Sequence, residues 1–153
     1  MTDLALAYDP ATHTADLCIA DGDLVLDDGL SSLVLMSLLT DARAAPEDVD
    51  AGEQDLRGWW GDAFSERALG GRLWTLGRAL ATDETARRAR DFALEALAWL
   101  MVDGIAAAVN VEATRTDGDG SGATLALDVE ILRFGPGRDA VSLRYDFLWR
   151  AMQ

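Results

Sequence analysis

The feature that most constrains the fold is a change in apolar periodicity, from two to about three and a half and back to two. Near the start, Leu4, Leu6 and Tyr8 alternate with smaller residues. Alternation of this kind is typical of half-buried strands. It continues through residues 17–26, where Asp21-Gly22 favours the positive φ angles of a tight hairpin turn. The first 26 residues therefore predict a small antiparallel meander.

Two segments in the middle of the chain have helical character. Residues 30–39 are apolar nearly all round, which predicts a short helix buried on most sides. The second helix begins after Thr82, which fits an N-cap, and its apolar positions recur at three- and four-residue spacing up to Leu100. Residues 40–56 carry Pro46, Gly52 and six acidic residues, so they predict a long surface loop.

Three further strands follow, because apolar residues alternate again over residues 109–113, 125–131 and 141–149. Glycine-rich stretches separate them. The expected fold class is α+β, with an N-terminal β-meander, two main helices and a C-terminal antiparallel sheet. We see no internal repeat and expect one domain spanning residues 1–153.

The charge of the chain limits its partners. There are 27 acidic and 13 basic residues, and every basic residue is an arginine. A surface with a formal net charge of −14 repels phosphate backbones and anionic membranes, so we expect neither nucleic-acid nor membrane binding. It is either a solvated acidic surface or one complementary to basic neighbours in an assembly. The N-terminus lacks the features of a signal peptide, so the protein is expected to be cytosolic when made.

The residue types needed for catalysis or metal binding do not form a recognisable motif. His13 is the only histidine, and its local sequence offers neither an orienting partner nor a pocket. The aspartates of residues 117–122 invite a calcium interpretation, but position twelve of such a loop falls on Asp128 in a predicted strand, which favours a β-turn. Most carboxylates fall in loops, turns or polar faces, and Asp62 and Asp103 adjoin glycines. We therefore expect no enzyme, no cofactor and no metal.

The most unusual feature is the stretch Arg-Gly-Trp-Trp-Gly-Asp at residues 57–62. Two adjacent tryptophans cannot share one face of a regular element, so at least one is expected to anchor the loop and to leave the other for a neighbour. A second cluster, Gly-Gly-Arg-Leu-Trp, follows at residues 70–74. Aromatic anchoring of a long loop and a protein–protein hot spot are both open. The candidate site comprises Trp59, Trp60, Gly61, Asp62, Gly71, Arg72 and Trp74.

In these two stretches, and in residues 96–104, the sequence resembles the Mu-type phage baseplate protein family called phage protein gene forty-six. Residues 22–30 and 38–43 also lie in the order expected of that family. The family is similar in layout to the baseplate wedge protein of T-even phages and to its type VI secretion counterpart. The wider group is sometimes labelled lysozyme-like, but the resemblance implies no hydrolase.

The resemblance implies a structural subunit in the wedge of a contractile tail baseplate, in a virion or an analogous injection particle. Its implied partners are other baseplate wedge proteins, the central hub and tube, and the sheath that it helps to initiate. We expect several symmetry-related copies, six in number. It also implies that a strand of residues 125–149 borders a neighbouring subunit. A tail-associated peptidoglycan hydrolase and an acidic binding adaptor are the alternatives.

Overall fold

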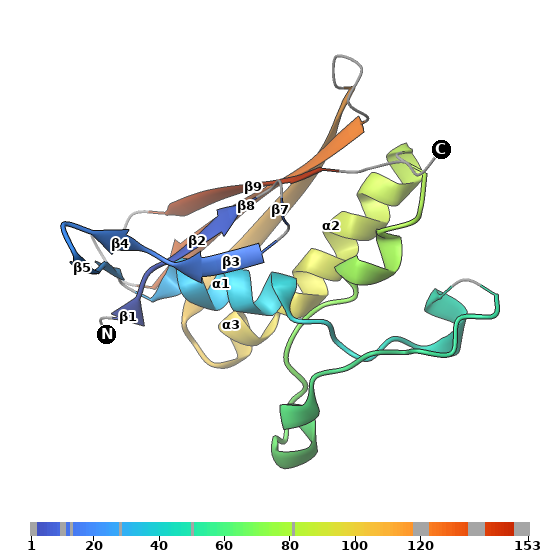
Figure 1. The fold of residues 1–153 in the computed structure, drawn as a ribbon, viewed down its shortest axis with the longest axis horizontal. Coiled ribbons are helices and arrows are strands. Elements are labelled where there is room, and N and C mark those ends of the chain that lie inside the picture. Colours follow the sequence, from blue (N-terminus) through green and yellow to red (C-terminus); the bar gives the residue numbers. More distant parts are fainter. Residues whose placement is uncertain are drawn as a thin grey trace.

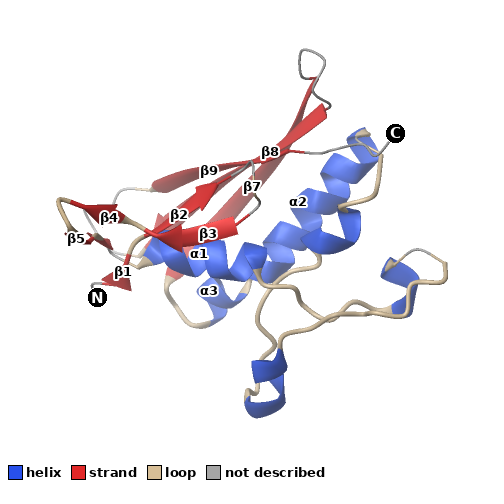
Figure 2. Ribbon diagram, viewed as in Figure 1, coloured by secondary structure: helices blue, strands red, loops and turns tan. Residues whose placement is uncertain are grey.

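The structure, a computed structural model, describes residues 3–9, 12, 14–27, 29–49, 51–80, 82–117, 123–134 and 140–148. It confirms the α+β class: small antiparallel strands at the N-terminus, two main helices, and a C-terminal antiparallel sheet (Figures 1 and 2). Its regular elements begin with β1 (Asp3–Leu4), β2 (Leu6–Asp9), β3 (Thr14–Leu17), β4 (Ile19–Ala20), β5 (Asp23–Leu24), β6 (Leu26–Asp27) and α1 (Leu30–Leu39). They continue with the 3-10 turns η1 (Pro46–Asp48), η2 (Trp60–Phe64) and η3 (Leu73–Leu76), then α2 (Asp83–Leu97), α3 (Trp99–Val102), β7 (Ala106–Asp117), β8 (Ala123–Arg133) and β9 (Val141–Leu148).

The N-terminal strands pair as three separate two-stranded ladders, which differs from a simple meander. β2 pairs with β3, β4 with β5, and the last strand β6 returns to pair with β1, all antiparallel. The turn between β4 and β5 has the expected conformation, with φ of 52° at Asp21 and 83° at Gly22. We call this segment, residues 3–27, the three-armed unit.

The two main helices form as the sequence predicts. Most side chains of α1 are buried, including those of Leu30, Val34 and Leu38. The hydroxyl of Thr82 accepts a hydrogen bond from the Thr85 amide at 3.2 Å, which confirms the N-cap of α2. The helical segment extends to Val102 but is divided at Ala98, where the Ala98 amide donates to the Glu95 carbonyl three residues back.

The C-terminal sheet has the order β7-β8-β9 and is antiparallel throughout. Its inner face packs on the helices, and the core includes Leu97, Leu100, Leu127, Val129 and Ile131, each 0% exposed. The outer face is polar and carries the pairs Asn110–Glu130 and Asp128–Arg144. Among the described strands, β7 and β9 are the edges, and β7 is partly covered because Arg90 donates to the Val111 carbonyl at 3.1 Å.

Candidate functional site

The candidate site lies on a loop of residues 40–80 that leaves the core after α1 and returns before α2 (Figure 1). Its two ends run side by side, since Asp41 and Gly71 form an isolated parallel bridge. The Gly71 amide donates to the Thr40 carbonyl at 3.0 Å, and the Ala42 amide donates to the Gly71 carbonyl at 3.1 Å. The base of the loop is therefore tied to the C-terminal end of α1.

This close approach of two backbone segments requires glycine. A Cβ atom added at Gly70 would lie 2.2 Å from the Thr40 carbonyl oxygen, and the residue has a φ of +103°. At the candidate residue Gly71, an added Cβ would lie 3.0 Å from the Cβ of Ala96 in α2. The glycine pair thus lets the loop pack directly on both helices.

Three arginines hold the loop in the same way. Each guanidinium pairs with a carboxylate and also lies over an aromatic ring, a combination that the planar arginine head favours. We call them the three arginine clamps. They are Arg57 with Asp41 (2.7 Å) and Trp74 (4.4 Å to the ring centroid), Arg67 with Asp103 (2.9 Å) and Trp99 (4.9 Å), and Arg72 with Asp48 (2.6 Å), Glu95 and Phe92 (4.4 Å).

The clamps change the electrostatics of their carboxylates. The hydrogen bond from Arg72 lowers the pKa of Asp48 below its ordinary value of 3.8, although burial acts in the opposite direction. The hydrogen bonds from Arg67 likewise lower the pKa of Asp103. Both carboxylates are therefore held in the ionised form, as suits ion pairs that tie a loop down.

The tryptophans of the two stretches have different roles. Trp74 anchors the loop, because its indole Nε1 donates to the Ala42 carbonyl at 2.9 Å and the Arg57 guanidinium lies over its ring. Trp59 lies against Gly61, where an added Cβ would come within 2.3 Å of the indole ring. Trp59 also borders a surface hollow of about 210 Å³ that Met36 and Trp99 help to line.

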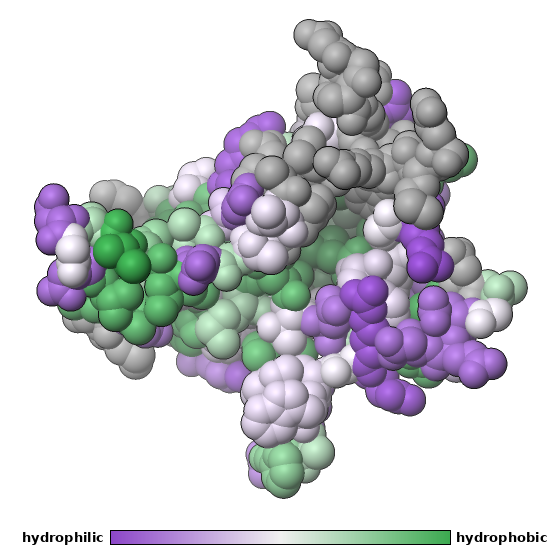
Figure 3. Space-filling model, viewed as in Figure 1, coloured by the Kyte–Doolittle hydropathy of each residue, from purple (hydrophilic) through white to green (hydrophobic). Residues whose placement is uncertain are grey.

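Trp60 is 76% exposed, against 38% for Trp59. Phe64, on the same 3-10 turn, is 84% exposed and meets Trp60 edge to face, with ring centroids 6.4 Å apart. In the space-filling view this part of the loop protrudes from the lower side of the molecule (Figure 3). The turn thus presents two large aromatic side chains to solvent.

The remaining candidate, Asp62, shapes this turn. Its carboxylate accepts a hydrogen bond from the Leu69 amide at 2.9 Å, and its own amide donates to the Trp59 carbonyl. All seven predicted residues thus lie on one loop, but only the segment around Trp60 is turned outward. The candidate list from the sequence omitted Phe64, Arg67 and Arg57, although Arg57 begins the first tryptophan stretch. An aromatic residue four positions after Trp60 was a readable signal for Phe64, whereas nothing local links Arg67 to Asp103.

Among the described residues, no group of three or more His, Cys, Asp or Glu side chains is arranged to hold a metal ion. His13 and residues 118–122 of the possible calcium loop lie outside the described residues. No helix within the described ranges is both long enough and apolar enough to cross a bilayer.

The fold and the loop together define a small α+β protein that displays aromatic side chains on an arginine-clamped loop. The chain belongs to the family described as "Phage protein GP46", whose model matches residues 30–136. It is 44% identical over 114 residues to "Baseplate protein gp46" of Escherichia phage Mu, covering 74% of this chain and 77% of that protein. It is 38% identical over 115 residues to "Mu-like prophage FluMu protein gp46" of Haemophilus influenzae, with the same coverage of both chains.

Proposed function

We propose that this chain is a structural subunit of a contractile phage-type tail baseplate. The observation that carries the proposal is its membership of the GP46 family, with a relative named as a baseplate protein that aligns over 74% of the chain. The virion tail, or an analogous injection particle, is the corresponding location. We further propose that it occupies the wedge, contacts the hub and tube, and helps to initiate the sheath.

The outward turn of the loop supports an assembly role. Exposed tryptophan is rare on a monomer surface and is enriched at the centres of protein interfaces. The turn that carries Trp60 and Phe64 is fixed at its base by the bridge at Gly71 and by the arginine clamps. A preorganised surface loses less conformational entropy on binding. We therefore propose Trp60 and Phe64 as contacts to a neighbouring baseplate protein.

The position of β9 at the border of the described sheet supports a second contact, to the sheath or to another neighbour. β9 pairs with β8 and contains no proline, a residue that blocks strand pairing at sheet edges. An extended arm of another subunit would pair with such a border strand by β-augmentation. Six symmetry-related copies in the particle would give such arms a repeated docking strand.

A map of purified particles from the host that encodes this chain tests the proposal. We expect density for six copies in the baseplate wedge, with η2 against a neighbouring protein and a foreign chain beside β9. Absence of the chain from purified tails would contradict the baseplate role. Its presence with β9 facing solvent along its whole length would contradict only the strand contact.

The alternative, a peptidoglycan hydrolase, finds little support in the carboxylates. A general acid needs a raised pKa. Asp48 and Asp103, carboxylates that arginines pair with, both have a pKa that is shifted downward. We expect purified protein to leave peptidoglycan intact in a zymogram. Clearing that one Asp or Glu substitution abolishes would overturn the structural role.

A further inference from the structure

The three-armed unit is built on a short sequence repeat that periodicity alone did not reveal. The pattern Asp-Leu-x-Leu/Ile occurs at residues 3–6, 16–19 and 23–26. The x residues, Ala5, Cys18 and Val25, meet at the centre. A ring of three backbone hydrogen bonds joins them, from the Ala5 amide to the Val25 carbonyl (2.8 Å), from Val25 to Cys18 (2.9 Å) and from Cys18 to Ala5 (2.9 Å).

This pseudo-threefold arrangement gathers apolar side chains on one face. Side chains alternate along a strand, so the residues on either side of each central residue point away from it, to the opposite face. Residues paired across a ladder share a face. By these two rules, three apolar cross-strand pairs lie on the same face of the unit. They are Leu4 with Leu26, Leu6 with Leu17, and Ile19 with Leu24. We call these six side chains the junction face.

The core covers only part of the junction face. Leu6 packs against the core cluster, whereas Ile19 is 72% exposed and Leu26 is 60% exposed. Leu4, Leu17 and Leu24 are also exposed. Beside Leu6 the apolar surface continues into a hollow of about 390 Å³ between β3 and α1. Figure 3 shows apolar side chains gathered over this end of the molecule. Contiguous exposed apolar surface of this kind marks interaction sites.

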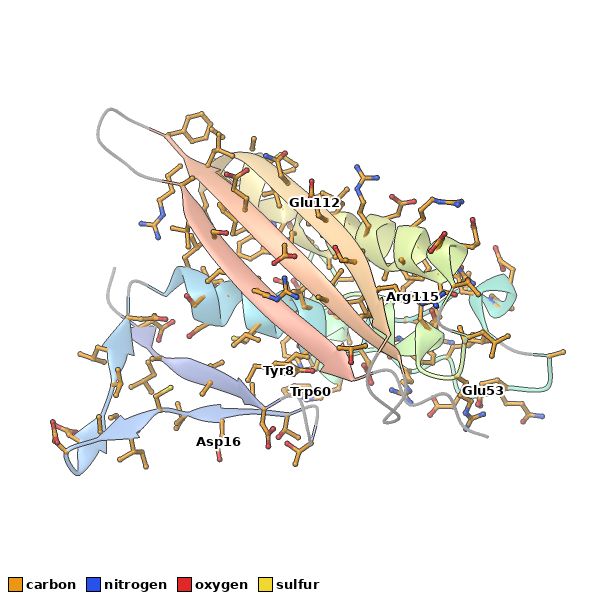
Figure 4. The ribbon with its side chains drawn as sticks, turned by 90° about the horizontal axis from the view of Figure 1, so that it is seen from above. Tyr8, Asp16, Glu53, Trp60, Glu112 and Arg115 are labelled. Carbon is orange, nitrogen blue, oxygen red and sulfur yellow. The ribbon has the colours of Figure 1, made fainter. Side chains whose placement is uncertain are left out.

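The negative charge around the junction face favours a binding partner with basic residues. Residues 1–42 contain eight aspartates and no arginine or lysine. Asp16 lies on the opposite side of its arm from Tyr8 (Figure 4). By strand register, Asp3, Asp23 and Asp27 also point to that reverse face. The arms are two strands wide, so these carboxylates lie close enough for their field to reach a bound ligand within the Debye length of about 8–10 Å. A second copy of this unit would bring aspartates together, which is unfavourable.

We infer that the junction face is a docking surface for a segment of another protein whose apolar side chains are flanked by lysine or arginine. The apolar part of the segment covers Leu17, Ile19, Leu24 and Leu26, and its basic flanks lie within the negative field of the aspartates on the reverse face of the arms. This inference uses residues 3–27, which precede the span matched by the family model, and it does not depend on the proposed wedge position.

The test uses the full chain and two synthetic peptides with the same leucine- and valine-rich centre, one flanked by lysines and the other by glutamates. We expect the lysine peptide to bind about tenfold tighter or more in low salt, measured by fluorescence anisotropy. The difference should shrink in about 1 M salt, where the Debye length is about 3 Å. Equal binding of the two peptides, or binding of neither, would overturn the inference.

Two double variants, each with a matched control, locate the binding. The first combines Ile19→Thr and Leu26→Thr and removes apolar surface from the junction face. Its control combines Val102→Thr and Leu80→Thr, which removes exposed apolar surface elsewhere. Asp16→Asn with Asp23→Asn removes charge but keeps the oxygens that accept from Leu17 and Leu24, and Glu112→Gln with Glu130→Gln removes equal charge from the sheet. We expect the two double variants in the three-armed unit to weaken lysine-peptide binding, and the two double control variants to leave it unchanged, all with unchanged circular dichroism. A control that weakens binding as much as its matched variant would overturn the assignment to this face.

Discussion

The helix–sheet core and the loop of residues 40–80 are stabilised by different interactions. The core buries leucine, valine and isoleucine side chains of α1, α2 and the β7–β9 sheet against one another. The loop buries few large apolar side chains, Leu76 among them, and is held by arginine clamps and close glycine contacts. Core stability therefore depends on apolar volume, and loop stability depends on pairs of side chains that match in charge and shape.

The largest effect is expected in the core. Leu97 is fully buried in α2, so Leu97→Ala removes apolar contacts and leaves a cavity. We predict a loss of about 2–5 kcal/mol in the free energy of unfolding, measured by urea denaturation. Val102→Ala in α3, where the side chain is 81% exposed, should change it by less than about 0.5 kcal/mol. Similar losses in both variants would show that α2 is not the centre of the core.

The base of the loop comes next. Gly70→Ala places a Cβ atom 2.2 Å from the Thr40 carbonyl oxygen at a positive φ, and Gly52→Ala has a similar φ with no atom within 4 Å. We predict a loss of about 1–3 kcal/mol for Gly52→Ala from backbone strain, and a larger loss for Gly70→Ala because the bridge must also open. Equal losses in thermal denaturation would mean that the close approach at Thr40 contributes nothing.

The clamp at Arg72 should give a smaller effect that depends on pH. Arg72→Gln removes the partner of Asp48 and Glu95, and we predict a loss of about 1–3 kcal/mol near neutral pH. Arg78→Gln, an exposed arginine 3.9 Å from Glu53, is the matched control and should lose less than about 1 kcal/mol.

The pH dependence of that clamp follows from Asp48. The pKa of Asp48 is lowered in the folded state. Its ion pair with Arg72 therefore contributes fully to folding stability above pH 3.8, the ordinary pKa, and this contribution is lost as the pH falls through the lower folded pKa. The stability difference between wild type and Arg72→Gln should therefore narrow in acid below about pH 4. A difference that stays constant down to acid unfolding would exclude the Asp48 pairing.

The same contrast explains which features the sequence predicts. Apolar periodicity and the Thr82 N-cap report local geometry, so α1, α2 and the strands β7–β9 were predictable. The clamps join residues far apart in the chain, such as Arg67 and Asp103, and no periodic signal records such pairs. The threefold Asp-Leu-x-Leu/Ile pattern in residues 3–26 was present in the sequence, but its spacing is uneven, so periodicity did not indicate the ring of hydrogen bonds that joins it.

The proposed assembly role of the outward turn is tested most directly by Trp60→Ala in a phage or prophage that lacks the wild-type gene. Because Trp60 is 76% exposed, we predict a change of less than about 0.5 kcal/mol in unfolding free energy, together with incomplete tails in electron micrographs. Leu80→Ala, at a side chain that is 72% exposed, should keep both stability and tail assembly. Complete tails at wild-type numbers from a folded Trp60→Ala protein would contradict the role of this turn as an assembly contact.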